Sequence, residues 1–207
     1  MKTDLSFLQS TDTPTRFIQQ LQFILELDKL KDVIRRSKLM SVDRFENSAE
    51  HSWHLAMMAM VFAEYADEPI DILRVLKMLL VHDIVEIDAG DTYLYDAAGA
   101  VDKLAREQQA AARLFGLLPE EQATEFTALW EEYEAKETAD ARFANVMDRT
   151  MPLMHNFFAE GEMWQKNKVT VEQVEARGIP KPGGADQLRA VAQAFIAEAV
   201  NRGYLER

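Results

Sequence analysis

The sequence predicts an all-α protein, a single helical bundle of six to eight helices. Apolar residues recur at spacings of three and four along nearly the whole chain, which is the pattern of amphipathic helices. Runs that alternate between apolar and polar residues, as half-buried strands do, are hard to find. Because 207 residues suffice for one substantial core, we expect one domain over residues 1–207.

Three helices are predicted in the first half of the chain, at 14–33, 48–66 and 70–87. Pro14 suits an early helical position in the first helix. Ser48 is a plausible N-terminal cap of the second. The third begins after a proline and ends before Gly90, so both of its ends carry ordinary helix-boundary residues.

The second half continues the helical pattern after a loop at 88–100. One helix should stop at Gly116, a natural C-terminal residue. A later one should bend at Pro152. The predicted helices of this half are 102–116, 119–140, 139–161 and, after a connection rich in proline and glycine, 187–200.

Composition excludes several classes of protein. With 23 basic and 35 acidic residues the net charge is −12, which repels a polyanion, so we expect no nucleic-acid polymer as partner. The chain has no cysteine, which excludes disulfides, thiolate metal sites and cysteine nucleophiles. No stretch reaches the roughly 18 apolar residues of a membrane span. We expect an untargeted, soluble, cytoplasmic protein without a membrane partner.

The stretch "LLVHDIVEIDAGD", residues 79–91, interrupts an apolar helix with several acids and a histidine. His82 and Asp83 are adjacent, so both can reach one point near the helix end but cannot both face a dry core. His51 opens the preceding helix. Helices joined by a short connection usually pack antiparallel, which brings the start of one beside the end of the next. Asp148, an acid inside an apolar helix, is a candidate fourth ligand from farther along.

These residues together resemble a known family. "EHS" at 50–52, "HDIVE" at 82–86, "GD" at 90–91 and Asp148 are similar in order and spacing to the HD-domain phosphohydrolases, closest to the 5'-deoxynucleotidase-like branch. The resemblance covers about residues 17–160 and leaves 161–207 as a C-terminal helical extension.

The resemblance implies one divalent transition metal held by two imidazoles and two carboxylates. This ligand set suits Mn, Co, Fe, Ni or Zn and does not choose among them. The interval between Asp83 and Asp148 contains no histidine, whereas relatives with two metals have histidines there, so we expect a mononuclear site. The implied ligands are His51, His82, Asp83 and Asp148.

The same resemblance implies an enzyme that hydrolyses phosphate from (deoxy)nucleoside monophosphates through hydroxide activated by the metal. Glu86 and Asp91 would be the catalytic groups that move protons. Arg36 matches the family's phosphate-orienting arginine. The expected substrate-binding residues are Arg36, Ser37, Asp83, Asp91, Thr92 and Asp148.

Ser37 departs from the family pattern, because the bacterial relatives carry tryptophan after the arginine. A smaller side chain should weaken the discrimination between deoxyribose and ribose. His54 and His155 are expected to have structural roles. The alternatives left open are an HD phosphodiesterase or nucleotide pyrophosphohydrolase acting on a larger nucleotide, and a non-catalytic nucleotide-binding module. A homodimer is possible, since dimers are common in the family.

Overall fold

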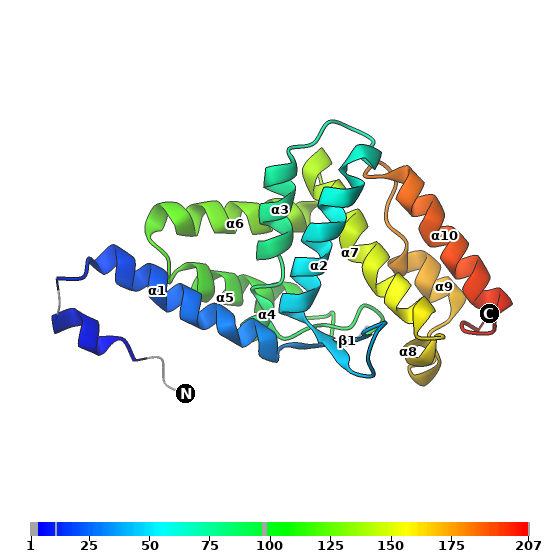
Figure 1. The fold of residues 1–207 in the computed structure, drawn as a ribbon, viewed down its shortest axis with the longest axis horizontal. Coiled ribbons are helices and arrows are strands. Elements are labelled where there is room, and N and C mark those ends of the chain that lie inside the picture. Colours follow the sequence, from blue (N-terminus) through cyan, green and yellow to red (C-terminus); the bar gives the residue numbers. More distant parts are fainter. Residues whose placement is uncertain (1–3, 11, 97–98, 207) are drawn as a thin grey trace.

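A computed structural model describes residues 4–10, 12–96 and 99–206, and it confirms the predicted all-α helical bundle (Figure 1). Residues 97 and 98 of the predicted loop lie outside this description. The helical segments are η1 (Ser6–Ser10), α1 (Thr15–Leu27), η2 (Asp28–Asp32), α2 (Ser48–Phe62), η3 (Ala63–Tyr65), α3 (Ile72–Val81), α4 (Glu86–Ala89), α5 (Lys103–Phe115), α6 (Glu120–Ala135), α7 (Ala139–Phe158), α8 (Glu162–Lys166), α9 (Val171–Gln173), the π-helical turn η4 (Val174–Gly178) and α10 (Asp186–Asn201). Across the described residues, no helix has the length and apolar character that a membrane crossing requires.

One element escaped the sequence prediction. β1 (Ile34–Lys38) and β2 (Phe45–Asn47) pair as an antiparallel hairpin, with Ile34 opposite Asn47 and Lys38 opposite Phe45. The strands are short and carry mostly polar residues, so no alternating apolar run marks them. The hairpin lies directly before α2 and therefore fixes how the chain enters that helix.

The predicted helix 70–87 is divided in two. α3 ends at Val81, and the next residues form a tight turn in which Ile84 N–H donates to Val81 O and Glu86 N–H to Asp83 O. α4 then runs to Ala89 and stops at Gly90, whose φ of 75° suits glycine. His82, Asp83 and Glu86 therefore lie at the junction of two helices and not within one continuous helix.

The N-terminal cap of α2 is Asn47, so the prediction of Ser48 as the cap is wrong. Asn47 Oδ1 accepts from the Glu50 N–H at 2.9 Å, and the Glu50 carboxylate accepts from the Asn47 N–H at 3.2 Å. This capping box leaves the Ser48 hydroxyl free for a contact outside the helix end.

The apolar interior has three parts, and the polar site lies where they meet. One part lies among α2, α3, α6 and α7, with Leu55, Met78 and Phe143 fully or almost fully buried. A second joins α1 and α5 to α6, and a third packs α8 and α10 on the C-terminal half of α7. Figure 1 shows α1 and α10 at opposite ends of the molecule, with α2, α3 and α7 between them.

Candidate active site

His51 and Asp148 meet in the middle of the bundle. His51 lies in the first turns of α2 and is completely buried, and its Nε2 lies 3.1 Å from Oδ1 of Asp148 on α7. Burial and the nearby Arg35 lower the pKa of His51, but the hydrogen bond with Asp148 and the adjacent carboxylate of Glu46 outweigh them and raise it to about 9. Without a metal, the ring is therefore a cation between two acids.

His82 lies at the C-terminal end of α3 and reaches the same cluster. Its Nδ1–H donates to the carbonyl of Leu79 at 2.8 Å, which leaves Nε2 with its lone pair. Nε2 lies 3.0 Å from Asp83 Oδ1 and 4.0 Å from Asp148 Oδ1. Burial lowers the pKa of His82 to about 4, so this ring is neutral.

The four predicted ligands fit a divalent metal ion. Ligand atoms of His51, His82 and Asp83 lie within 4.8 Å of one another, and Asp148 contacts both rings. The buried Nε2 of His82 has no hydrogen-bond partner among the residues that the structure describes, as expected of a ligand atom. Two imidazoles with carboxylates are a donor set for a first-row transition metal.

Glu86 lies beside this cluster and has a partner of its own. Ser48 donates its hydroxyl to Glu86 Oε2 at 2.7 Å, and both side chains are buried. Burial and the charge of Asp83 raise the pKa of Glu86 well above its ordinary value. A carboxyl group in this state can hold a proton near neutral pH and release it during a reaction.

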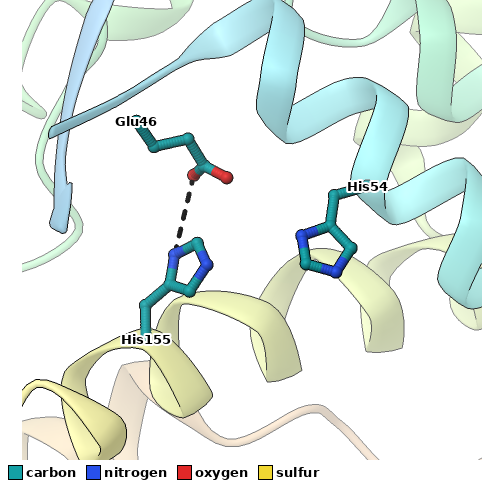
Figure 2. A group of neighbouring side chains, drawn as sticks. All are labelled: Glu46, His54 and His155. Atoms are coloured by element: carbon teal, nitrogen blue, oxygen red, sulfur yellow. Dashed lines mark ion pairs between the residues drawn. The ribbon is translucent and has the colours of Figure 1, made fainter. Parts of the chain in front are cut away.

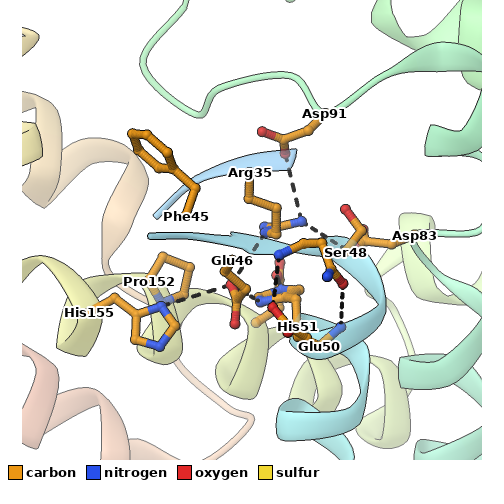
Figure 3. A network of polar contacts seen from close by, with 12 residues as sticks. Arg35, Phe45, Glu46, Ser48, Glu50, His51, Asp83, Asp91, Pro152 and His155 are labelled. Atoms are coloured by element: carbon orange, nitrogen blue, oxygen red, sulfur yellow. Dashed lines mark hydrogen bonds and ion pairs between the residues drawn. The ribbon is translucent and has the colours of Figure 1, made fainter. Parts of the chain in front are cut away.

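The structure brings Arg35, which sequence reasoning missed, to the acids. Its Nη1 lies 2.8 Å from Asp83, 3.6 Å from Asp91 and 3.7 Å from Glu86 (Figure 3). The Arg36 guanidinium instead lies 5.1 Å from the centre of the Tyr93 ring. The strand pairing is irregular between Ile34 and Lys38, so strict alternation of side chains does not hold there and the sequence does not show which arginine faces the acids.

A cavity of about 240 Å³ opens above the cluster, and the remaining predicted residues line it. Ser37 is buried, whereas Asp91 and Thr92 are half-buried on the loop after α4. The lining carries charges of both signs. Its cations are Arg35, Arg36, Lys103, Lys136 and Arg149, and its carboxylates are Asp83, Glu86, Asp91, Glu107, Glu134 and Asp148. A divalent metal ion held by some of these carboxylates would offset their charge and let the cavity accept a small anion.

The two remaining histidines lie behind the cluster, away from the cavity. His155 on α7 is buried, and its Nδ1 lies 3.8 Å from Glu46 Oε2 (Figure 2). His54 on α2 lies beside the same carboxylate, and the centre of its ring lies 6.3 Å from the centre of the His155 ring. Glu46 itself, on β2, was not singled out from the sequence, because nothing marks a single acid between phenylalanine and asparagine.

Comparison with known proteins identifies the family. Residues 27–188 match the HD domain family, and the chain therefore belongs to the HD domain family. The predicted resemblance to this family is thus confirmed. The match begins at residue 27, not at 17, and extends past residue 160 into the C-terminal segment, where α10 packs on α7. The assignment of the whole chain to one domain stays a prediction.

Three relatives illustrate the likeness. A protein of Magnetospirillum magnetotacticum MS-1, described as a predicted metal-dependent phosphohydrolase, is 54% identical with a TM-score of 0.89 over 93% of this chain and 97% of that one. The human 5'-deoxynucleotidase HDDC2 is 35% identical over 130 residues, a match that spans 62% of this chain and 62% of the human protein. The PH0347 protein of Pyrococcus horikoshii OT3, at 21% identity and a TM-score of 0.60, shares the fold.

Proposed function

We propose that this chain is a metal-dependent phosphohydrolase that releases phosphate from (deoxy)nucleoside monophosphates. The observation that carries the proposal is the convergence of two imidazoles and two carboxylates beside a small cavity whose lining also includes arginines and lysines. The human relative named 5'-deoxynucleotidase and the solved relative described as a metal-dependent phosphohydrolase support the same activity.

His51, His82, Asp83 and Asp148 would hold one divalent ion, with Mn, Co, Fe, Ni and Zn as the candidates. When bound, such an ion lowers the pKa of a coordinated water and screens the charge of the phosphate. The Leu79 carbonyl keeps the Nε2 lone pair of His82 available by accepting from Nδ1–H.

The protein's own groups would then bind the phosphate and move protons. Arg35 presents its guanidinium beside Asp83 and Asp91, where its planar fork can hold two phosphoryl oxygens. Glu86, held by Ser48, would protonate the leaving 5'-oxygen or accept the proton of the attacking water. Asp91 is the second candidate for proton transfer, and Arg36 and Thr92 would bind the rest of the nucleotide.

A phosphate-release screen tests the proposal. Metal-free protein is incubated with each candidate metal and with deoxyribo- and ribonucleoside monophosphates, triphosphates and a phosphodiester. Phosphate should appear from monophosphates only with metal, and Asp83→Ala should abolish it. Release from diesters or triphosphates alone would favour the larger-substrate enzymes, whereas inactivity with bound metal would indicate a non-catalytic module.

Ser37 should influence the choice of sugar. Its side chain lines the cavity, and serine leaves space that a larger residue would fill. Ser37→Trp should therefore raise the ratio of kcat/KM for dAMP over AMP by roughly tenfold, because crowding excludes the extra hydroxyl. An unchanged ratio in the Trp variant would show that this position does not select the sugar.

The proposal includes a homodimer in the cytoplasm, where nucleoside monophosphates are available. One face of α2 exposes large apolar side chains, which is unusual for a monomer surface. These are Trp53, Met57, Met60 and Val61, with exposed fractions between 40% and 63%. Light scattering should give twice the mass of the chain, and Trp53→Glu should shift it towards the monomer.

A further inference from the structure

The carboxylate of Glu46 is the most completely buried acid of the site, and the mechanism above does not use it. Its side chain is 1% exposed, on strand β2 just before the cap of α2. A buried charge is costly unless other groups compensate it. Although burial by itself raises the pKa of Glu46, the neighbouring His51, His155 and Arg35 hold it below the ordinary value.

Three nitrogen atoms surround one oxygen of this carboxylate. Oε2 lies 3.2 Å from His51 Nδ1, 3.7 Å from Arg35 Nε and 3.8 Å from His155 Nδ1 (Figure 3). None of these contacts is a well-aligned hydrogen bond within the described part of the chain. The shortest links Glu46 to a predicted metal ligand.

The two nitrogens of His51 face different acids. Nε2 is hydrogen-bonded to Asp148 on the side of the predicted metal, while Nδ1 faces Glu46 on the opposite side. A metal bound at Nε2 would take the place of the proton there, and the ring would keep one proton, on Nδ1. Its nearest acceptor is Glu46. Such a carboxylate fixes the tautomer and orientation of a ligating imidazole and strengthens it as a donor.

We propose that Glu46 is a positioning residue for the metal ligand His51: it accepts the Nδ1–H and so keeps Nε2 aimed at the metal. His155 and Arg35, which face the same oxygen, hold the carboxylate in place. The inference rests on the metal-binding part of the proposed function and does not depend on the identity of the substrate.

A second metal at Glu46, His54 and His155 is the competing explanation, since ligand atoms of these residues also lie within 4.8 Å of one another (Figure 2). The arginine is the argument against it. Arg35 Nε lies 3.7 Å from Oε2 of the carboxylate that such an ion would need, and a permanent cation there opposes a divalent one. A second metal would also leave the close contact between Glu46 and His51 unexplained.

The test measures Co²⁺ binding by the full-length protein, by competition with a chelator and by the visible absorption of the bound ion. Glu46→Gln keeps the size of the side chain and removes its charge. It should weaken Co²⁺ binding by roughly 10- to 100-fold and change the spectrum. Glu46→Asp keeps the charge but shortens the side chain, so its affinity for Co²⁺ should lie between those of the parent and of Glu46→Gln. Glu26→Gln is the matched control, because Glu26 is a buried, ion-paired acid that belongs neither to the cavity lining nor to the clusters of possible ligands, and it should bind as the parent does.

The outcomes separate the two proposals. A parent that binds no Co²⁺ contradicts the proposed function, whereas a parent and a Glu46→Gln variant that bind equally tightly overturn only the role of Glu46. Two equivalents of Co²⁺ in the parent, falling to one in His54→Ala, would overturn it in favour of the second metal.

If the Glu46→Gln variant does not fold, a measurement on the unmodified protein still tests the proposal. The chain has four histidines, so long-range ¹H–¹⁵N spectra of the Zn²⁺-loaded protein can assign each ring. His51 should show a proton on Nδ1 and zinc on Nε2. Zinc on Nδ1 would contradict the assignment.

Discussion

At the scale of single residues, the environment of Glu86 decides what this carboxyl group can do. Its pKa is raised because it is buried next to Asp83, and Ser48 donates to one of its oxygens. Glu86→Gln should keep the metal and lose activity by about 10²–10⁴-fold, because an amide cannot exchange the proton. Steady-state kinetics and metal analysis on the same sample check this. Full activity in the variant would exclude Glu86 from proton transfer.

The adjacent arginines provide a matched pair. Arg35 is buried among acids, whereas Arg36 stacks on Tyr93 at the surface of the cavity. Arg35→Lys should lower kcat/KM by roughly 10- to 100-fold, because an ammonium loses the two-pronged contact with phosphate, and Arg36→Lys should lower it less. The reverse order would restore Arg36, the residue favoured by the sequence, as the main phosphate ligand.

At the scale of elements, the capping box at Asn47 connects helix stability to the site. Asn47 lies between Glu46 and the helical turn that carries His51, so loosening the cap should disturb both. Asn47→Ala should lower the free energy of unfolding by about 0.5–2 kcal/mol, or the melting temperature by roughly 2–6 °C. It should also weaken Co²⁺ binding.

Thr170→Ala is the control for this prediction, because Thr170 forms the equivalent capping box at the start of α9 and does not line the site. Thr170→Ala should lower the free energy of unfolding by about as much as Asn47→Ala does, without changing the affinity for Co²⁺. Equal affinities in the parent and Asn47→Ala would show that the cap does not support the metal ligands.

At the scale of the whole molecule, the buried groups make the stability of the metal-free protein depend on pH. The pKa of His51 is raised to about 9 and that of Glu86 is also raised, so between pH 6.5 and 9 the folded state binds more protons than the unfolded state. Stability must therefore fall as pH rises through this window. The pKa of His82 is lowered to about 4, so below pH 6.5 this ring binds a proton more readily in the unfolded state than in the folded state. His82 therefore lowers the stability as the pH falls.

Thermal unfolding in the presence of a chelator checks the direction. The melting temperature should drop by roughly 5–10 °C from pH 6.5 to 9. With Zn²⁺ bound the drop should be smaller, because the metal replaces the proton on His51 Nε2. A melting temperature that rises across this range in the metal-free protein would contradict the assigned protonation states.

The sequence was sufficient for the helical class and for the approach of His51 to His82 and Asp83, because helix periodicity and the pairing of consecutive helices are local rules. Asp148 lies 97 residues from His51, and only the resemblance to the HD-domain phosphohydrolases placed it in the same group. It was insufficient for the hairpin, since polar strands of five and three residues leave no periodic signal. The same gap hid Arg35 and Glu46, whose directions depend on the register and the irregular pairing of those strands. Burial depth, which sets the protonation of Glu86, is also a property of the folded chain.

The separation of the proposed ligands along the chain would have a consequence for the protein in a cell. His51 and Asp148 are 97 residues apart in sequence, so the ion that we propose they share would work as a cross-link that the unfolded chain does not have. Ligand binding to the folded state alone lowers the unfolded fraction in proportion to ligand supply. Proteases degrade the unfolded fraction. Starvation for the metal would then reduce the cellular abundance of this protein as well as its activity.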